Sequence, residues 1–221
     1  MTREPAYNNG RITHRKIMAM LRIENLQKNY ESHPVFRGLT LDLGPGCYAL
    51  CDEESTGKST LLNIVAGRLP HDGGDVFING HSITLQRDQA LTQLAWVPDN
   101  CLSEPMLTGQ QLLQRTAAEK RVDIGPDVLE WVRQLDLEPH LEKQFEQMST
   151  GMRRKVYLAA AAIGDPAVIL ADGPSDGLDA SACRALAAQF NIWGADRVVL
   201  FATFDPELIQ ASGAKLLALQ G

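Results

Sequence analysis

The stretch that decides the fold is GCYALCDEESTGKSTLLNIVA, residues 46–66. The apolar run 48–51 predicts a buried strand, and a polar loop follows it. Apolar residues at helical spacing after Gly57-Lys58-Ser59-Thr60 predict a helix. Strand, loop and helix in this order are the context of a phosphate-binding loop, in which backbone N–H groups and the helix N-terminus hold phosphate.

Lys58 and Ser59 stand where such a loop has the lysine that reaches the outer phosphates and the hydroxyl that binds Mg²⁺. The pattern departs at Asp52, where the loop expects glycine. Carboxylates near a phosphate cost about 1 kcal/mol each in water and about 4 kcal/mol at a semi-buried dielectric. Either the acidic side chains point outward, or nucleotide binding is weakened, or the Gly-Lys-Ser-Thr run starts a helix by coincidence. The loop residues expected to contact nucleotide are Asp52, Glu53, Glu54, Ser55, Thr56, Gly57, Lys58, Ser59 and Thr60.

Composition limits the classes of function. The chain has 221 residues, 44% of them hydrophobic, which suits one large domain or a domain with an insert. Its net charge of −6 does not suggest a nucleic-acid partner. No apolar run approaches the roughly 18 residues that span a bilayer. If the protein acts at a membrane, we expect it to do so through a partner protein. The four cysteines form no Cys-x-x-Cys pair, which predicts small buried residues in a reducing compartment rather than a zinc site.

Residues 1–20 differ from the rest. They are polar and basic, with Arg3, Arg11, Arg15 and Lys16 against Glu4, and no apolar core follows. This is not a secretory signal, and we expect a disordered tail before a single domain at 21–221. Met18 and Met20 leave open a later natural start.

The remaining helices and strands are predicted from the periodicity of apolar residues and from the turn residues between them. No strand pattern occurs between 106 and 147, where helical spacing predicts a helical insert of about 104–160. Ser149 is a good helix N-cap. Tyr30, between the first two predicted strands, is either a surface tyrosine or a platform for an adenine ring. The expected strands cover 21–26, 35–43, 48–51, 76–78, 94–97, 167–171, 197–203 and 215–219, and the run 167–171 is apolar enough for a central parallel strand.

From Leu21 to Gly221 the chain resembles the nucleotide-binding subunit of an ATP-binding cassette (ABC) transporter. The resemblance implies an α/β fold of the P-loop NTPase type, with a mostly parallel central sheet, an antiparallel β part and a helical insert. It rests on several motifs in order: Tyr30 for the adenine-stacking aromatic, 52–60 for the Walker A loop, Asp99 at the Q-loop glutamine, 148–152 for the signature, Asp172 for the Walker B aspartate, 177–179 for the D-loop and 203–205 for the switch.

The resemblance also implies roles and partners. ATP and Mg²⁺ are the expected cofactors, with Ser59, Asp99 and Asp172 around the metal. Beside the loop and Tyr30, the residues Ser149, Gly151 and Asp179 are expected to contact nucleotide across a dimer. The expected partners are a transmembrane permease subunit and a second ABC ATPase subunit, in a homodimer or heterodimer. The expected location is cytoplasmic, on the inner face of the cell membrane through the permease.

The departures from the family pattern concern catalysis. Gly173 stands at the catalytic glutamate, and Phe204 stands at the switch histidine. Losing a general base costs 10²–10⁴-fold in rate, and losing the group that positions the attacking water costs more. Asp99, Asp176 and Asp205 are weak candidates for a replacement base. The signature has Thr150 and Met152 beside Ser149 and Gly151, and the Walker A loop lacks glycine at Asp52 and Ser55.

Three hypotheses follow. In the first, the chain is a degenerate subunit that binds ATP and completes the site of a competent partner subunit. In the second, it is an active homodimeric ATPase with compensating residues. In the third, it is a non-hydrolysing regulatory or scaffold protein, which the triplet Asp52-Glu53-Glu54 favours. The transported substrate and the direction of transport are not encoded in these motifs.

Overall fold

The computed structural model describes residues 19–31, 33–51, 56–102 and 104–219. The expected tail at 1–20 lies almost wholly outside these residues, and so do Asp52, Glu53, Glu54 and Ser55 of the predicted phosphate loop.

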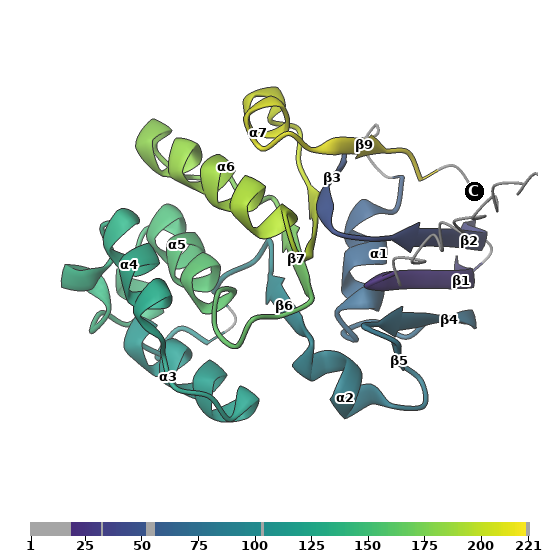
Figure 1. Cartoon of the computed structure of the whole chain (residues 1–221), viewed down its shortest axis with the longest axis horizontal. Helices are drawn as coiled ribbons and strands as arrows, with labels where there is room; N and C mark the ends of the chain where they lie inside the picture. The colour runs from purple at the N-terminus through teal and green to yellow at the C-terminus, as the bar shows by residue number, and fades with distance from the viewer. Residues whose placement is uncertain (1–18, 32, 52–55, 103, 220–221) are drawn as a thin grey trace, which may run out of the picture.

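Two sheets organise the described residues (Figure 1). In one sheet, every neighbouring pair of strands is parallel. Its order is β6 (Leu94–Val97), β7 (Val168–Asp172), β8 (Val198–Ala202), β3 (Gly46–Leu50) and β9 (Lys215–Leu217). The other sheet is antiparallel, in the order β2 (His33–Leu43), β1 (Leu21–Tyr30), β4 (Gly73–Ile78) and β5 (His81–Ser82). The predicted α/β class, a parallel sheet with an antiparallel part, is confirmed.

The strand patterns have different physical origins. Every residue of β7 and β8 is buried, because helices or the second sheet cover both faces of a central parallel strand. In β1 the buried residues Leu21 and Ile23 alternate with exposed ones, as in a half-buried strand. The predicted end of this strand at residue 26 is wrong, since β1 continues to Tyr30. A bulge at Asn25, whose φ is 48°, shifts the register after Ile23 and resets the alternation, so the period-2 pattern is interrupted in the sequence.

The helices cover the parallel sheet and form the insert. They are α1 (Lys58–Val65), α2 (Arg87–Thr92), α3 (Gly109–Lys120), α4 (Pro126–Gln134), α5 (Thr150–Ala160), α6 (Ala180–Gly194) and α7 (Pro206–Ala211), with short 3₁₀ turns η1 (Glu138–His140) and η2 (Phe145–Gln147). Between Met106 and Gln147 the described backbone pairs as β structure only at the isolated bridge of Thr108 with Gln144. Helices α3, α4 and α5 lie together at the left of Figure 1, opposite the antiparallel sheet.

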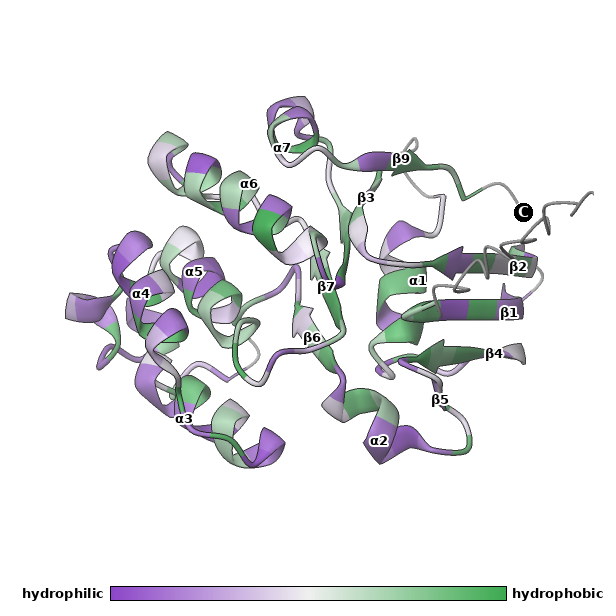
Figure 2. Ribbon diagram, in the orientation of Figure 1, coloured by the Kyte–Doolittle hydropathy of each residue, from purple (hydrophilic) through white to green (hydrophobic). Residues whose placement is uncertain are grey.

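The parallel sheet separates the buried side chains of the described residues into two clusters. Ile169 and Ala171 of β7 face the cluster with the inserted helices, and Val168 and Leu170 face the cluster with α1 and the antiparallel sheet. In Figure 2 polar and apolar bands follow one another along β1 and β2, and the helices carry a polar and an apolar side. None of the helices in the described part has the length and apolar character needed to cross a membrane.

A substitution of Phe190 tests the contribution of the cluster that includes the inserted helices. Phe190 is fully buried on α6, with its ring centroid 5.1 Å from that of Phe201 on β8 and 6.0 Å from that of Trp193. We expect Phe190→Ala to lower the free energy of unfolding by about 3–5 kcal/mol, since the substitution leaves a cavity. Urea denaturation measures this loss. Ile192→Ala on the same helix is the control, because Ile192 is 65% exposed and should change stability by no more than about 0.5 kcal/mol.

Candidate nucleotide site

Several of the predicted site residues lie at one edge of the parallel sheet. Because β3, β6, β7 and β8 are parallel, their carboxyl ends meet at the same edge, where ligands of open α/β sheets bind. Asp172 is the last residue of β7, and Asp99 follows β6 by two residues. Phe204 follows β8 by two residues, and the phosphate loop follows β3.

Gly57 and Lys58 begin helix α1. Gly57 is the N-cap residue in the left-handed conformation, with φ of 90°. A Cβ at Gly57 would lie 2.5 Å from Cγ1 of Val35, so only glycine fits this close approach to β2. The Lys58 side chain is buried. Its Nζ lies 3.5 Å from Thr56 Oγ1 and 4.7 Å from the centroid of the Phe204 ring.

A cavity of about 480 Å³ opens beside Lys58. The half-exposed Tyr30 of β1 lines it together with Ser59 and Thr60 of α1, and Phe204 lines it as well. The Lys28 ammonium lies 5.4 Å from the centroid of the Tyr30 ring. The cavity thus offers the Tyr30 ring, the Lys58 ammonium group and the hydroxyls of Ser59 and Thr60. An aromatic face can stack on a base, and ammonium and hydroxyl groups can bind phosphate and its metal ion.

Asp172 lies beside Ser59 and is only 8% exposed. Burial raises the pKa of its carboxyl above the ordinary value, the Ser59 hydroxyl opposes this, and the nearby Asp99 carboxylate adds to the rise. Oxygen ligands of this kind suit Mg²⁺. Within the described residues, however, no three His, Cys, Asp or Glu side chains come close enough to form a metal site by themselves. The residues therefore fit a metal held by one carboxylate and one hydroxyl together with a phosphate group.

Arg154 joins two of these strand ends and was not predicted as a site residue. Its side chain is 2% exposed, and Nη1 donates to the carbonyl oxygens of Pro98, at 2.9 Å, and Asp172, at 2.8 Å. Nη2 lies 3.5 Å from the Asp99 carboxylate. The sequence signal was the spacing of Gly151, Arg154 and Leu158 on α5, which places all three on its buried face.

Gly173 and Asp176 form a tight turn after β7. The Asp176 N–H donates to the Gly173 carbonyl at 3.1 Å, and Gly173 has φ of 57°. A Cβ at Gly173 would overlap the Asp176 carboxylate and lie 3.6 Å from Asp99 Oδ1. The Asp176 carboxylate thus lies beside the position that the family resemblance assigns to the catalytic glutamate.

The signature residues lie on a different part of the molecule from the Lys58 cavity. Ser149 caps α5, with its hydroxyl accepting from the Met152 N–H at 3.2 Å, and its side chain is exposed. Gly151 is buried against the Gly177 carbonyl, with no room for a Cβ. None of these residues lines the Lys58 cavity.

Asp179 and Asp205 are occupied as helix caps. Asp179 caps α6, and hydrogen bonds from Ser181, from the Ala182 N–H and from Lys155 hold the pKa of its carboxyl below the ordinary value. Asp205 accepts from the N–H groups of the two residues that begin α7 after Pro206, at 3.0 and 3.2 Å. The Asp205 carboxylate is thus engaged at the start of α7 and does not line the cavity beside Lys58.

The sequence matches the family model described as "ABC transporter" over residues 36–176, more than half of the chain. The chain belongs to the ABC transporter family. Among proteins similar to it is the linearmycin resistance ATP-binding protein LnrL of Bacillus subtilis strain 168, 28% identical over 170 residues, which cover 72% of this chain and 53% of LnrL. Another is the sn-glycerol-3-phosphate import ATP-binding protein UgpC of Paracoccus denitrificans, 31% identical over 172 residues, which cover 74% of this chain and 47% of UgpC. The chain thus spans about half the length of these relatives.

The fold agrees with solved members of this family. A dimeric structure of MJ0796 in a post-hydrolysis state, bound to ADP and Pi, superposes with a TM-score of 0.76 over 91% of this chain and 94% of that one. The sequence identity is 21%, so the likeness concerns the fold.

Arg154 can be tested by removing its charge. We expect Arg154→Met to lower the free energy of unfolding by about 2–5 kcal/mol, because the carbonyls of Pro98 and Asp172 lose a charged donor while staying buried. Arg133→Met is the control, since Arg133 makes only an exposed pair with Glu130, worth about 0.5 kcal/mol or less. Equal losses in the two variants, measured in urea, would contradict the anchoring role.

Gly173 can be tested by adding a side chain. We expect Gly173→Glu to cost about 1–3 kcal/mol of unfolding free energy, because glutamate in the left-handed region is strained and the Asp176 carboxylate must move. Gly173→Asn must also displace Asp176, but asparagine tolerates this backbone conformation better, so its cost should be smaller. Thermal unfolding compares the two variants, and equal melting temperatures would show that the backbone conformation is not the limiting factor.

Proposed function

We propose that the chain is an ATP-binding subunit of an ABC transporter that binds Mg-ATP and hydrolyses it slowly. One observation carries this proposal: the residues expected to bind nucleotide are present, whereas the residues expected to activate water are replaced. The groups proposed to hold a nucleotide, Lys58, Ser59 and Asp172, lie at one edge of the sheet. The two positions that would activate and place water carry Gly173 and Phe204, and neither side chain offers a proton acceptor.

Mg²⁺ and ATP fit the residues in the following way. Tyr30 would stack on the base, and Lys58 and the N-terminus of α1 would hold the outer phosphates. Ser59 and Asp172 would hold Mg²⁺, with Asp99 as a more exposed candidate beside Arg154. The metal would neutralise phosphate charge, and Ser59 and Asp172 would hold it in place.

A second ABC subunit is the proposed partner. Ser149, Gly151 and Asp179 do not line the cavity that holds Lys58, so a single chain does not assemble both halves of a family site. The dimeric form of MJ0796 supports an arrangement in which each half is completed by another subunit. In a heterodimer, Ser149 of this chain would complete the competent site of the partner.

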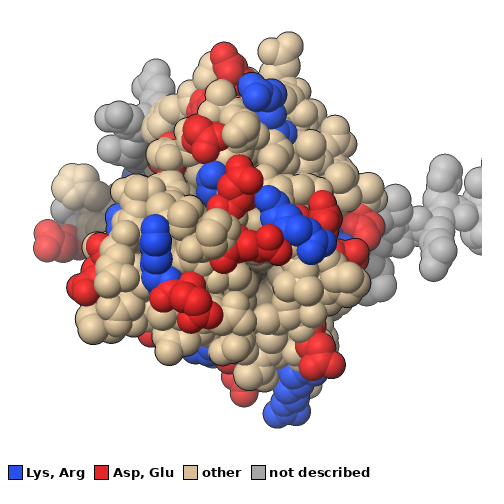
Figure 3. Space-filling view, turned by 90° about the vertical axis from the view of Figure 1, so that its left-hand side faces the viewer, with Lys and Arg blue, Asp and Glu red and all other residues tan. Residues whose placement is uncertain are grey.

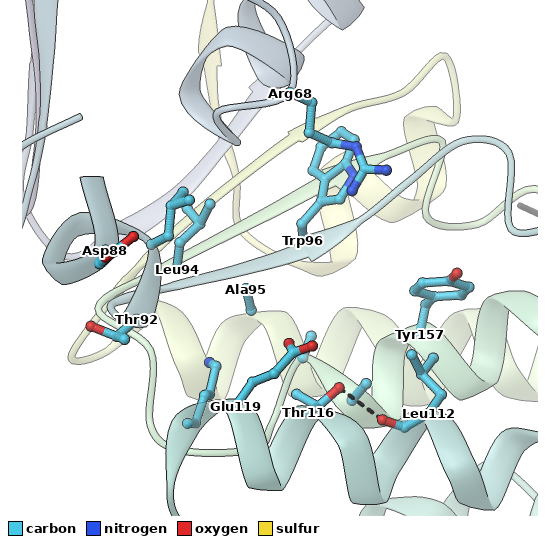
Figure 4. A pocket seen from close by; sticks show the side chains of 14 residues that line it. Arg68, Asp88, Thr92, Leu94, Ala95, Trp96, Leu112, Thr116, Glu119 and Tyr157 are labelled. Atoms are coloured by element: carbon cyan, nitrogen blue, oxygen red, sulfur yellow. Dashed lines mark hydrogen bonds between the residues drawn. The ribbon is translucent and has the colours of Figure 1, made fainter. Parts of the chain in front are cut away.

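A transmembrane permease is the proposed second partner. Residues 104–160 would form a helical subdomain, and a cavity of about 400 Å³ lies between it and the parallel sheet. Figure 4 shows Trp96 and Arg68 on one side of this cavity and Tyr157, Glu119 and Thr116 of the helices on the other. A permease helix seated there would hold the subunit on the inner face of the membrane.

The surface of the helical part agrees with a protein partner. On the face in Figure 3, lysine and arginine side chains are interspersed with acidic ones over a largely uncharged surface. No continuous basic area covers this face, so it does not offer the footprint of a nucleic-acid site.

One observation favours an active homodimer as the second candidate. The Asp176 carboxylate lies beside Gly173, where a compensating base would have to be. Turnover by the purified chain alone separates the candidates: a rate near that of competent family members supports Asp176 as the base, and a rate lower by about 10² or more supports the degenerate subunit.

Two variants test the heterodimer within the isolated complex. We expect Ser149→Ala to lower ATP turnover by the complex about tenfold or more, because it removes a hydroxyl from the partner's site. Lys58→Ala should chiefly reduce the nucleotide retained by this chain, which chromatography of released nucleotide measures. Thr150→Ala, next to Ser149 and also exposed, is the matched control. An unchanged turnover in Ser149→Ala would exclude the heterodimer arrangement.

A further inference from the structure

A second cavity, also of about 480 Å³, lies at the end of α1 that is remote from the phosphate loop. It shares no lining residue with the Lys58 cavity, which we also call the nucleotide cavity. Arg68, His71, Thr84 and Arg87 supply its polar wall, and apolar side chains supply the rest. We propose that this cavity binds the phosphate group of a phosphomonoester.

The charge of the cavity is the first argument. Two arginines line it and no carboxylate does, in a chain whose net charge is −6. Neither Arg68 nor Arg87 forms an ion pair with any carboxylate of the described residues. Guanidinium groups are a common means by which proteins bind phosphate.

The fixed position of Arg87 is the second argument. Its Nη2 donates to the Gly67 carbonyl, and a Cβ at Gly67 would lie 3.0 Å from that nitrogen. The guanidinium therefore packs directly on the backbone of the turn that ends α1. A donor held in this way loses little side-chain freedom when an anion binds, which favours binding.

His71 is the third argument. Its Nε2 lies 3.2 Å from Thr84 Oγ1, and that hydroxyl donates its proton to Asp75 Oδ1 at 2.9 Å. Nε2 is therefore the donor to Thr84, which leaves Nδ1 for another group. Nδ1 is buried and meets no hydrogen-bond partner in the described part of the chain. Because Nδ1 has almost no accessible surface, a phosphomonoester meets it only after a small movement of the ring. A neutral ring would then accept from P–OH, and a protonated ring would donate to P–O⁻.

The carboxylates near the cavity are engaged elsewhere. Asp72 accepts from the Asn29 N–H at 2.6 Å and pairs with Lys28 at 3.4 Å. Asp75 accepts from the hydroxyls of Ser82 and Thr84. Asp88 follows Arg87 and lines the cavity between the sheet and the helices, which Arg68 also borders. None of these three carboxylates lines the cavity.

Nuclear magnetic resonance of the ¹⁵N-labelled histidine rings tests the proposal in the full chain. Lys58→Ala serves as the background, so that phosphate binding at the nucleotide cavity does not contribute. His71→Gln identifies the His71 signals. We expect inorganic phosphate and methyl phosphate to shift them saturably, with a dissociation constant of about 10 mM or lower.

Arg87→Gln should weaken this binding about tenfold or more, because it removes a charged donor. Arg37→Gln, an exposed arginine of β2 that lines neither cavity, should leave it unchanged. An absent or non-saturating shift, an equal shift with chloride at the same ionic strength, or an equal effect of the two arginine variants would overturn the proposal. Such a result would not contradict the proposed nucleotide site, because that site is tested separately by measuring ATP binding.

Sedimentation with vesicles distinguishes the two sources of such a phosphate. Retention on phosphatidylcholine vesicles that contain phosphatidic acid, but not on phosphatidylcholine alone, would identify a lipid headgroup if Arg87→Gln abolishes it. A saturable shift without vesicle retention would identify a soluble phosphomonoester.

Discussion

The buried guanidinium of Arg154 is the contact on which the rest of the site depends. A charge that is 2% exposed is costly unless it is paired and hydrogen-bonded, and here two main-chain carbonyls and the Asp99 carboxylate surround it. The carbonyls belong to Pro98, after β6, and to Asp172, at the end of β7. An α5 residue therefore fixes the relative position of two strand ends whose side chains are expected to meet Mg²⁺.

Helix α5 also connects three regions on which the proposed function depends. Its N-cap Ser149 is the exposed residue proposed to complete a partner's site, and Arg154 holds the strand ends one and a half turns later. Tyr157 and Ala161, at the end of the helix, line the cavity proposed for the permease. A nucleotide-dependent shift of α5 would reach all three places, because they belong to one short rigid element.

The sequence predicted the parts of this structure that depend on local pattern. The apolar runs of β7 and β8 and the glycine-lysine step into α1 could be read directly, because burial and a left-handed N-cap demand those residue types. Three features were not predicted. The bulge at Asn25 hid the length of β1, and Arg154 stood in the charged run Arg153-Arg154-Lys155, which by composition looks exposed. The placement of Asp176 beside Gly173 depends on a turn whose geometry no spacing rule supplies.

The central claim is that a nucleotide site lacking its usual catalytic groups still binds Mg-ATP. Calorimetric titration of the purified chain with Mg-ATP tests it most directly, with Lys58→Ala as the control. The account predicts a dissociation constant in the range of about 1–100 μM, lost in the variant, since the lysine is the main phosphate-binding cation of the described site. No heat of binding at about 1 mM ATP, or the same affinity in the variant, would contradict it and leave the chain as an ABC-fold scaffold.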